Sequence, residues 1–73
     1  MYILLNSVEK LKEFVNGIEK FQCDLNLVSG MREVYAKSLL GIFSLDLTKP
    51  IEVKVLKMPK PIEVEELLTR YAP

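Results

Sequence analysis

The stretch FQCDLNLVSGMREVYA, residues 21–36, sets the fold class, because the spacing of its apolar side chains changes from that of a helix to that of a strand. Its first half alternates apolar and polar side chains, which is the pattern of a half-buried strand. The apolar positions are Phe21, Cys23, Leu25 and Leu27. Ser29 and Gly30 can form a turn, since glycine accepts a positive φ, and residues 33–36 return as a second strand. We therefore expect an antiparallel hairpin.

The residues before the hairpin have the period of an amphipathic helix. Its apolar stripe recurs every three or four residues and consists of Val8, Leu11, Val15 and Ile18, flanked by Phe14 and Phe21. Asn6 or Ser7 can cap the start of this helix. Ahead of it, residues 2–5 are a short apolar run that we expect to be the first strand.

Three further elements follow the hairpin. Ser38 begins a short helix that should end near Asp46, and residues 51–55 alternate as another strand. Pro61 fits the first turn of a last helix with the apolar face Val64, Leu67, Leu68 and Tyr71. The order β-α-β-β-α-β-α predicts one α+β domain over residues 1–73, a two-layer open-faced sandwich. Its small antiparallel four-stranded sheet should carry the helices on one face.

The composition excludes several function classes. Ten basic and ten acidic side chains give the 73 residues a net charge of zero, without a basic cluster for nucleic acid. The single cysteine, Cys23, and the absence of histidine leave no internal disulfide and no metal site of the Cys/His type. The apolar runs are far shorter than the roughly 20 residues of a membrane span. We expect a cytoplasmic protein in a reducing compartment.

The absence of histidine also argues against catalysis, because histidine is the commonest general base near neutral pH. The glutamates have the spacing of solvated helix faces, and Asp24 and Asp46 lie at the ends of expected elements. We therefore expect a protein that is not an enzyme and needs no cofactor or metal.

Residues 36–50, AKSLLGIFSLDLTKP, hold more apolar side chains than a short helix can bury: Leu39, Leu40, Ile42, Phe43 and Leu45. These five cover well over half of the helix circumference, whereas a helix on a sheet hides a stripe of about 100° or a little more. If Ile42 and Leu45 turn inward, the other three are exposed, and an exposed apolar cluster on a small protein indicates a contact site. Alternatively, the strands and the last helix surround the segment, and all five are core.

Ser38 also has two interpretations. As an N-cap, its hydroxyl accepts a hydrogen bond from a free backbone N–H and stabilises the helix by about 1 kcal/mol. The same position, beside unpaired N–H groups at the positive end of a helix, also tolerates a phosphate.

Residues 21–55 resemble the central part of the histidine-containing phosphocarrier protein (HPr) family of the sugar phosphotransferase system. Within them AKSLLGIFSLDL, residues 36–47, is similar to that family's signature KS-apolar-apolar-G-apolar-apolar-SL, which surrounds a regulatory phosphoserine. The resemblance covers about half of the chain, and the expected order of strands and helices is also the family's order.

Carried over by position, Ser38 matches the serine that the bifunctional HPr kinase/phosphorylase modifies in Gram-positive bacteria, and Lys37 matches the basic residue before it. Leu39, Leu40 and Phe43 match the exposed apolar patch by which family members meet their partners. Together with Lys37 they make up the partner-binding patch that the resemblance implies. The resemblance therefore favours the contact site over the core, and implies a protein partner such as HPr kinase/phosphorylase or a regulator.

The chain departs from the family at its active site. Family members carry a phosphoryl-accepting histidine in a G-x-H-A-R-P-type loop, where residues 4–14 of this chain read LLNSVEKLKEF. A relay from phosphoenolpyruvate needs an imidazole nucleophile, and the hydroxyl of Ser7 has no base to activate it. We therefore expect an HPr-like protein that has lost phosphocarrier activity and has a regulatory or binding role, switched by phosphorylation of Ser38.

Two alternatives stay open. In the first, the chain is a structural or assembly module, and the apolar patch is a permanent homodimer or heterodimer interface. In the second, it is a phosphocarrier component by family alone. The sequence does not set the oligomeric state.

Overall fold

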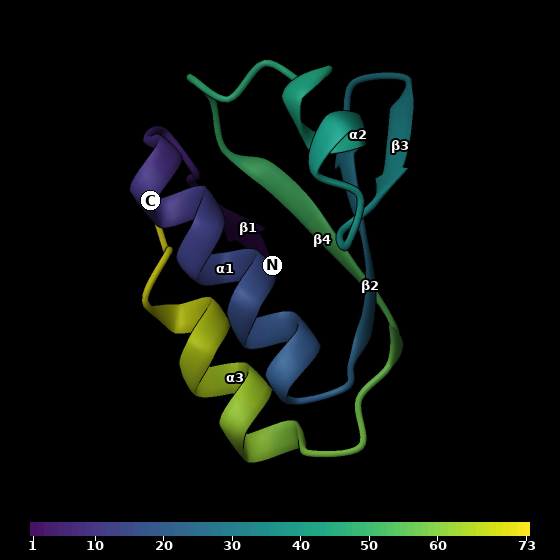
Figure 1. The fold of residues 1–73 in the computed structure, drawn as a ribbon. Coiled ribbons are helices and arrows are strands. Elements are labelled where there is room, and N and C mark those ends of the chain that lie inside the picture. Colours follow the sequence, from purple (N-terminus) through teal and green to yellow (C-terminus); the bar gives the residue numbers. More distant parts are fainter.

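The computed structural model describes residues 1–73 and has the element order β-α-β-β-α-β-α (Figure 1). The strands are β1 (Tyr2–Ile3), β2 (Asp24–Ser29), β3 (Arg32–Tyr35) and β4 (Ile51–Lys57). The helices are α1 (Val8–Lys20), α2 (Leu39–Phe43) and α3 (Pro61–Thr69). The strands form one 4-stranded antiparallel sheet in the order β1-β4-β2-β3. The predicted α+β class and element order are confirmed.

The hairpin lies where the alternation predicts it. Ser29 pairs with Arg32, and Gly30 in the turn between them has a φ of 60°, which glycine adopts without a steric cost. Leu25 and Leu27 of β2 point to the same side of the sheet and are fully buried. No residue of the opposite face, which carries Asp24, Asn26, Glu52 and Lys54, is in the buried core, so the sheet buries one face.

One hydrophobic cluster of 17 buried residues joins that face to all three helices. In Figure 1, α1 and α3 lie side by side over the sheet. Between α1 and the residues after α3, the ring of Phe14 meets that of Tyr71 edge-on, with centroids 5.8 Å apart. Ile42 brings α2 into the same cluster. A single core on one face of an antiparallel sheet is compatible with the predicted open-faced sandwich.

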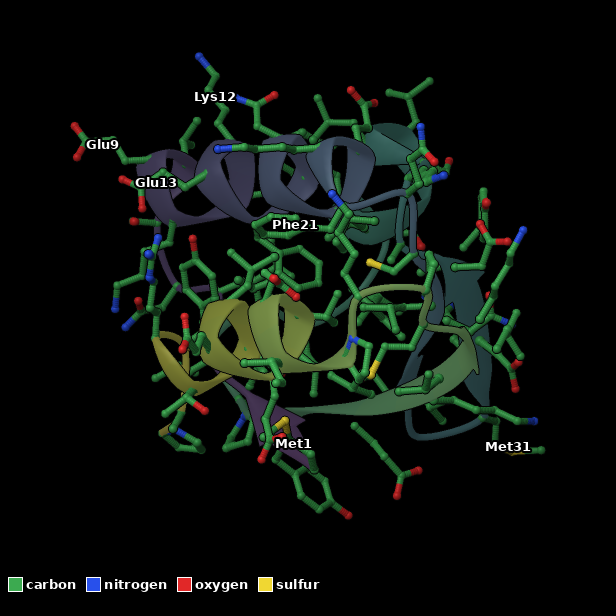
Figure 2. All side chains as sticks on the ribbon, turned by 90° about the horizontal axis from the view of Figure 1, so that it is seen from below. Met1, Glu9, Lys12, Glu13, Phe21 and Met31 are labelled. Atoms are coloured by element: carbon green, nitrogen blue, oxygen red, sulfur yellow. The ribbon has the colours of Figure 1, made fainter.

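The ends of the helix α1 follow its sequence. Of the two predicted caps, Ser7 is the N-cap, and its Oγ accepts a hydrogen bond of 3.1 Å from the backbone N–H of Lys10. Figure 2 shows Glu9 and Lys12 pointing away from the body of the molecule, as expected for the polar face. None of the helices has the length and apolar character that crossing a membrane requires.

Several local expectations were wrong. The strand predicted from Phe21 begins only at Asp24, and the short helix predicted to end near Asp46 ends at Phe43. The first strand ends at Ile3 rather than at Leu5, because the backbone N–H of Leu4 donates to the carbonyl of Tyr71 and not to a strand. The buried stripe of α1 consists of Leu11, Phe14 and Ile18, and Val8 at the head of the predicted stripe is 56% exposed. Phe14, which flanked the predicted stripe, is part of the buried stripe and packs edge-on against the ring of Tyr71.

Candidate functional site

Ser38 is the N-cap residue of α2. Its backbone is extended, with φ −92° and ψ 99°, and its carbonyl accepts the hydrogen bond of 2.9 Å from the N–H of Ile42. Its Oγ accepts a second hydrogen bond of 3.2 Å from the N–H of Gly41, so the hydroxyl satisfies one of the free amides of the first turn. The residue is exposed, and its hydroxyl is therefore accessible from solvent.

The apolar side chains of α2 divide into two groups. Ile42 and the following Leu45 are buried in the core. The exposed fractions of the others are 39% for Leu39, 85% for Leu40 and 49% for Phe43. We call these three residues the apolar patch. The surrounding elements therefore do not enclose α2, and an apolar surface lies directly after Ser38.

A shallow groove of about 190 Å³ continues the apolar patch toward the start of α1. Phe43 and the exposed Val8 both line it, and the remaining lining residues are Leu5, Asn6, Ser7, Leu11, Leu47 and Thr48. Val8 is a surface residue that the sequence analysis assigned to the core. Its position as the first residue of α1 is the sequence feature that distinguishes it from the buried residues of the helix.

Lys37 is not part of the apolar patch. Its Nζ lies 3.5 Å from Oδ1 of Asp24, and the hydroxyl of Tyr35 donates a hydrogen bond of 2.7 Å to the same oxygen. Asp24 and Tyr35 belong to the outer face of the sheet, since their neighbours Leu25 and Ala36 point into the core. The ammonium of Lys37 is therefore held at the outer face of the sheet.

These contacts shift the pKa values of all three groups. The hydrogen bond from Tyr35 lowers the pKa of Asp24 below its ordinary value, and the same bond raises the pKa of Tyr35. Desolvation alone would lower the pKa of Lys37, but Tyr35, once its hydroxyl is deprotonated, and the carboxylate of Asp24 raise it above its ordinary value. The carboxylate of Asp24 and the ammonium of Lys37 are thus both ionised at neutral pH.

The start of α1 lies in the part of the chain where HPr family members carry their active-site loop. Here Ser7 Oγ accepts from the backbone of Lys10, and the Nζ of Lys10 donates to Oδ1 of Asn6 at 3.1 Å. Neither neighbour is a base that could take a proton from the hydroxyl. No group of three or more His, Cys, Asp or Glu side chains comes together that could hold a metal ion.

Comparison with known proteins does not assign the chain to a family, because no family model matches it and no curated protein matches it.

The cap of α2 leads to a prediction for stability. Ser38→Ala removes the acceptor of the Gly41 N–H, so we expect the free energy of unfolding to fall by about 1 kcal/mol. Ser38→Asp keeps an acceptor at the N-cap and should lose less. Urea denaturation followed by circular dichroism measures both changes. Equal stability of wild type and Ser38→Ala would show that this hydrogen bond does not contribute.

Proposed function

We propose that this chain is an HPr-like protein without phosphocarrier activity, which binds a protein partner through the apolar patch and is regulated by phosphorylation of Ser38. The observation that carries the proposal is the exposure of Leu40 and Phe43, at 85% and 49%, on the short helix that Ser38 caps. The element order and the antiparallel sheet with one covered face are consistent with the family's sandwich. A regulated binding protein of this kind would act in the cytoplasm, without a cofactor or metal.

Phosphorylation would change the patch through charge. A phosphoserine carries about −1.5 to −2 charges at neutral pH. At Ser38 this charge would adjoin Leu39, and α2 has no charged side chain of its own to offset it. A partner with an apolar contact surface would have to desolvate the phosphate, whereas a partner with an arginine cluster would gain hydrogen bonds. Modification would therefore exchange one class of partner for another.

The proposal excludes a phosphoryl relay. The chain has no histidine, and the hydroxyl of Ser7 is engaged as the cap of α1. We expect the protein to take no label from phosphoenolpyruvate and enzyme I under conditions that label an ordinary HPr. Stable labelling would contradict the proposed loss of carrier activity.

The regulatory half of the proposal is tested with HPr kinase and ATP. The purified protein should gain one phosphate, measured as a mass increase of the intact chain and located by peptide mapping. An ordinary HPr serves as the positive control. No incorporation under conditions that label this control would overturn regulation at Ser38.

The continuity of the apolar patch with the groove beside Val8 favours a second candidate function, a permanent oligomer interface. A stable interface takes roughly 800 Å² from each partner, and the whole chain exposes 4683 Å². Leu40→Asp and Phe43→Asp distinguish the two functions by light scattering after gel filtration. A permanent interface would give an oligomer that these changes convert to monomers, whereas we expect a monomer in the wild type and in both variants.

A further inference from the structure

The connection between β3 and α2, residues 36–38, is held by two consecutive residues of β2. The carbonyl of Leu25 accepts a hydrogen bond of 2.9 Å from the N–H of Ala36. The carboxylate of Asp24 is paired with the ammonium of Lys37 at 3.5 Å. A main-chain hydrogen bond therefore attaches Ala36 to β2, and a side-chain ion pair attaches Lys37 to the same strand. Ser38 is the next residue.

Tyr35 at the end of β3 completes this arrangement. Its hydroxyl donates to Asp24 at 2.7 Å, and its carbonyl accepts from the N–H of Ser38 at 3.0 Å. One carboxylate therefore binds the side chains on both sides of Ala36. Ser38 follows Lys37 directly in the chain.

The strand pairing supports a special role of Asp24. Asp24 pairs with Lys57 and Leu25 pairs with Val55, so β4 has an extra residue, Leu56, at this point. Bulges of this kind occur next to functional sites, where they change the direction of a side chain. The register places the cation of Lys57 on the strand beside Asp24, and its charge also favours the ionised carboxylate. The side chains around Asp24 are thus two lysine cations, Lys37 and Lys57, and the hydroxyl donor of Tyr35. The carboxylate of Asp24 is the acceptor among them.

We propose that Asp24 is a positioning residue for Ser38, which fixes the connection 36–38 so that the hydroxyl caps α2 next to the apolar patch and faces a modifying enzyme in one geometry. The inference rests on the proposed regulation of Ser38 but has an independent readout. Asp24 acts through Lys37 and Tyr35 and does not itself contact the hydroxyl. Its effect is on how often the connection opens, and not on the chemistry of phosphate transfer.

The chain offers a matched control at Glu33. This carboxylate also lies on the outer face of the sheet, accepts a hydrogen bond of 2.6 Å from Asn26 and pairs with Lys54 at 3.6 Å. Glu33→Gln therefore makes the same charge change, with a similar set of partners, but without a link to residues 36–38. Any difference between Asp24→Asn and Glu33→Gln reports on the connection to Ser38.

Amide hydrogen exchange tests the positioning without a kinase. In Asp24→Asn we expect the amides of Ser38 and Gly41, which donate to Tyr35 and to Ser38 Oγ, to exchange roughly twofold to fivefold faster than in wild type. Lys37→Met should give a similar increase, and Glu33→Gln should leave both rates unchanged. Equal exchange in Asp24→Asn and Glu33→Gln would overturn the positioning role.

Phosphorylation kinetics with HPr kinase test the consequence. Asp24→Asn should lower kcat/KM for Ser38 by roughly the same twofold to fivefold, while Glu33→Gln should match wild type. If wild type takes no phosphate, the proposed regulation fails, and hydrogen exchange alone then decides the positioning role. If wild type is phosphorylated and Asp24→Asn is phosphorylated at the same rate, the inference is overturned although the regulation stands.

Discussion

Ile42→Ala will lower the free energy of unfolding by about 2–5 kcal/mol, whereas Leu40→Ala will change it by less than about 0.5 kcal/mol. Both residues belong to the five-residue helix α2, but Ile42 is fully buried and Leu40 is 85% exposed. Removing the Ile42 side chain leaves a cavity under α2 and removes apolar area from the core. Removing the Leu40 side chain takes away only surface that water already contacts.

The effect of Ile42→Ala is large relative to the stability of the whole protein. A domain of 73 residues is expected to have a free energy of unfolding of roughly 4–11 kcal/mol, from about 0.05–0.15 kcal/mol per residue. Urea titrations of wild type and both variants, fitted with a common slope, measure the two differences. A loss for Leu40→Ala as large as that for Ile42→Ala would place Leu40 in the core and remove the basis of the proposed docking.

The sequence is sufficient to predict those elements that the spacing of apolar side chains determines. The hairpin from β2 to β3 follows from the alternation Cys23, Leu25, Leu27 and from the glycine at the turn. The cap at Ser38 could also be predicted, because a serine before an apolar run satisfies a free amide wherever such a helix forms. These features depend on contacts between residues close in the chain.

The exposed face of α2 could not be decided in this way. The helix carries its own apolar side chains on most sides, so the periodicity alone does not distinguish the buried Ile42 from the exposed Leu40. The choice is made by tertiary contacts, such as that of Gly41 with Val34 of β3, where an added Cβ would lie 3.3 Å from the Val34 side chain. Only the approach of β3 shows which face of α2 turns toward the sheet.

The position of Lys37 at the outer face of the sheet had a signal in the sequence that the family resemblance obscured. Tyr35 points outward and Ala36 inward, so the next residue of the alternation, Lys37, points outward again. If the inward–outward alternation of β3 is continued through Ala36 and Lys37, Lys37 lies over the outer face of the sheet, close to Asp24. A signature carried over by position does not contain this information, because it names neighbours in the chain and not faces of the sheet.

Ser38→Ala will abolish phosphate incorporation by HPr kinase, if the proposed regulation is correct. Ser7 is also an exposed N-cap serine, but Glu9 in the first turn of α1 would repel a phosphate there, whereas the first turn of α2 has no acidic side chain. Ser44, which also lies next to the apolar patch, donates its own hydroxyl hydrogen to the carbonyl of Gly41 at 2.6 Å. It stands at the carboxyl end of α2, where a phosphate would face backbone carbonyls and not amides. A phosphate is therefore accommodated at Ser38 and opposed at Ser44.

The matched control is Ser44→Ala, which should take up one phosphate as wild type does. Ser38→Ala loses only about 1 kcal/mol of capping energy, so circular dichroism should show a folded protein and the loss of incorporation will not reflect unfolding. Ser38→Asp, folded and capped, should likewise take no phosphate. Undiminished incorporation in Ser38→Ala, or its loss in Ser44→Ala, would move the modified residue away from the N-cap of α2. The charge would then no longer adjoin Leu39, and the proposed switch of the apolar patch would have no physical basis.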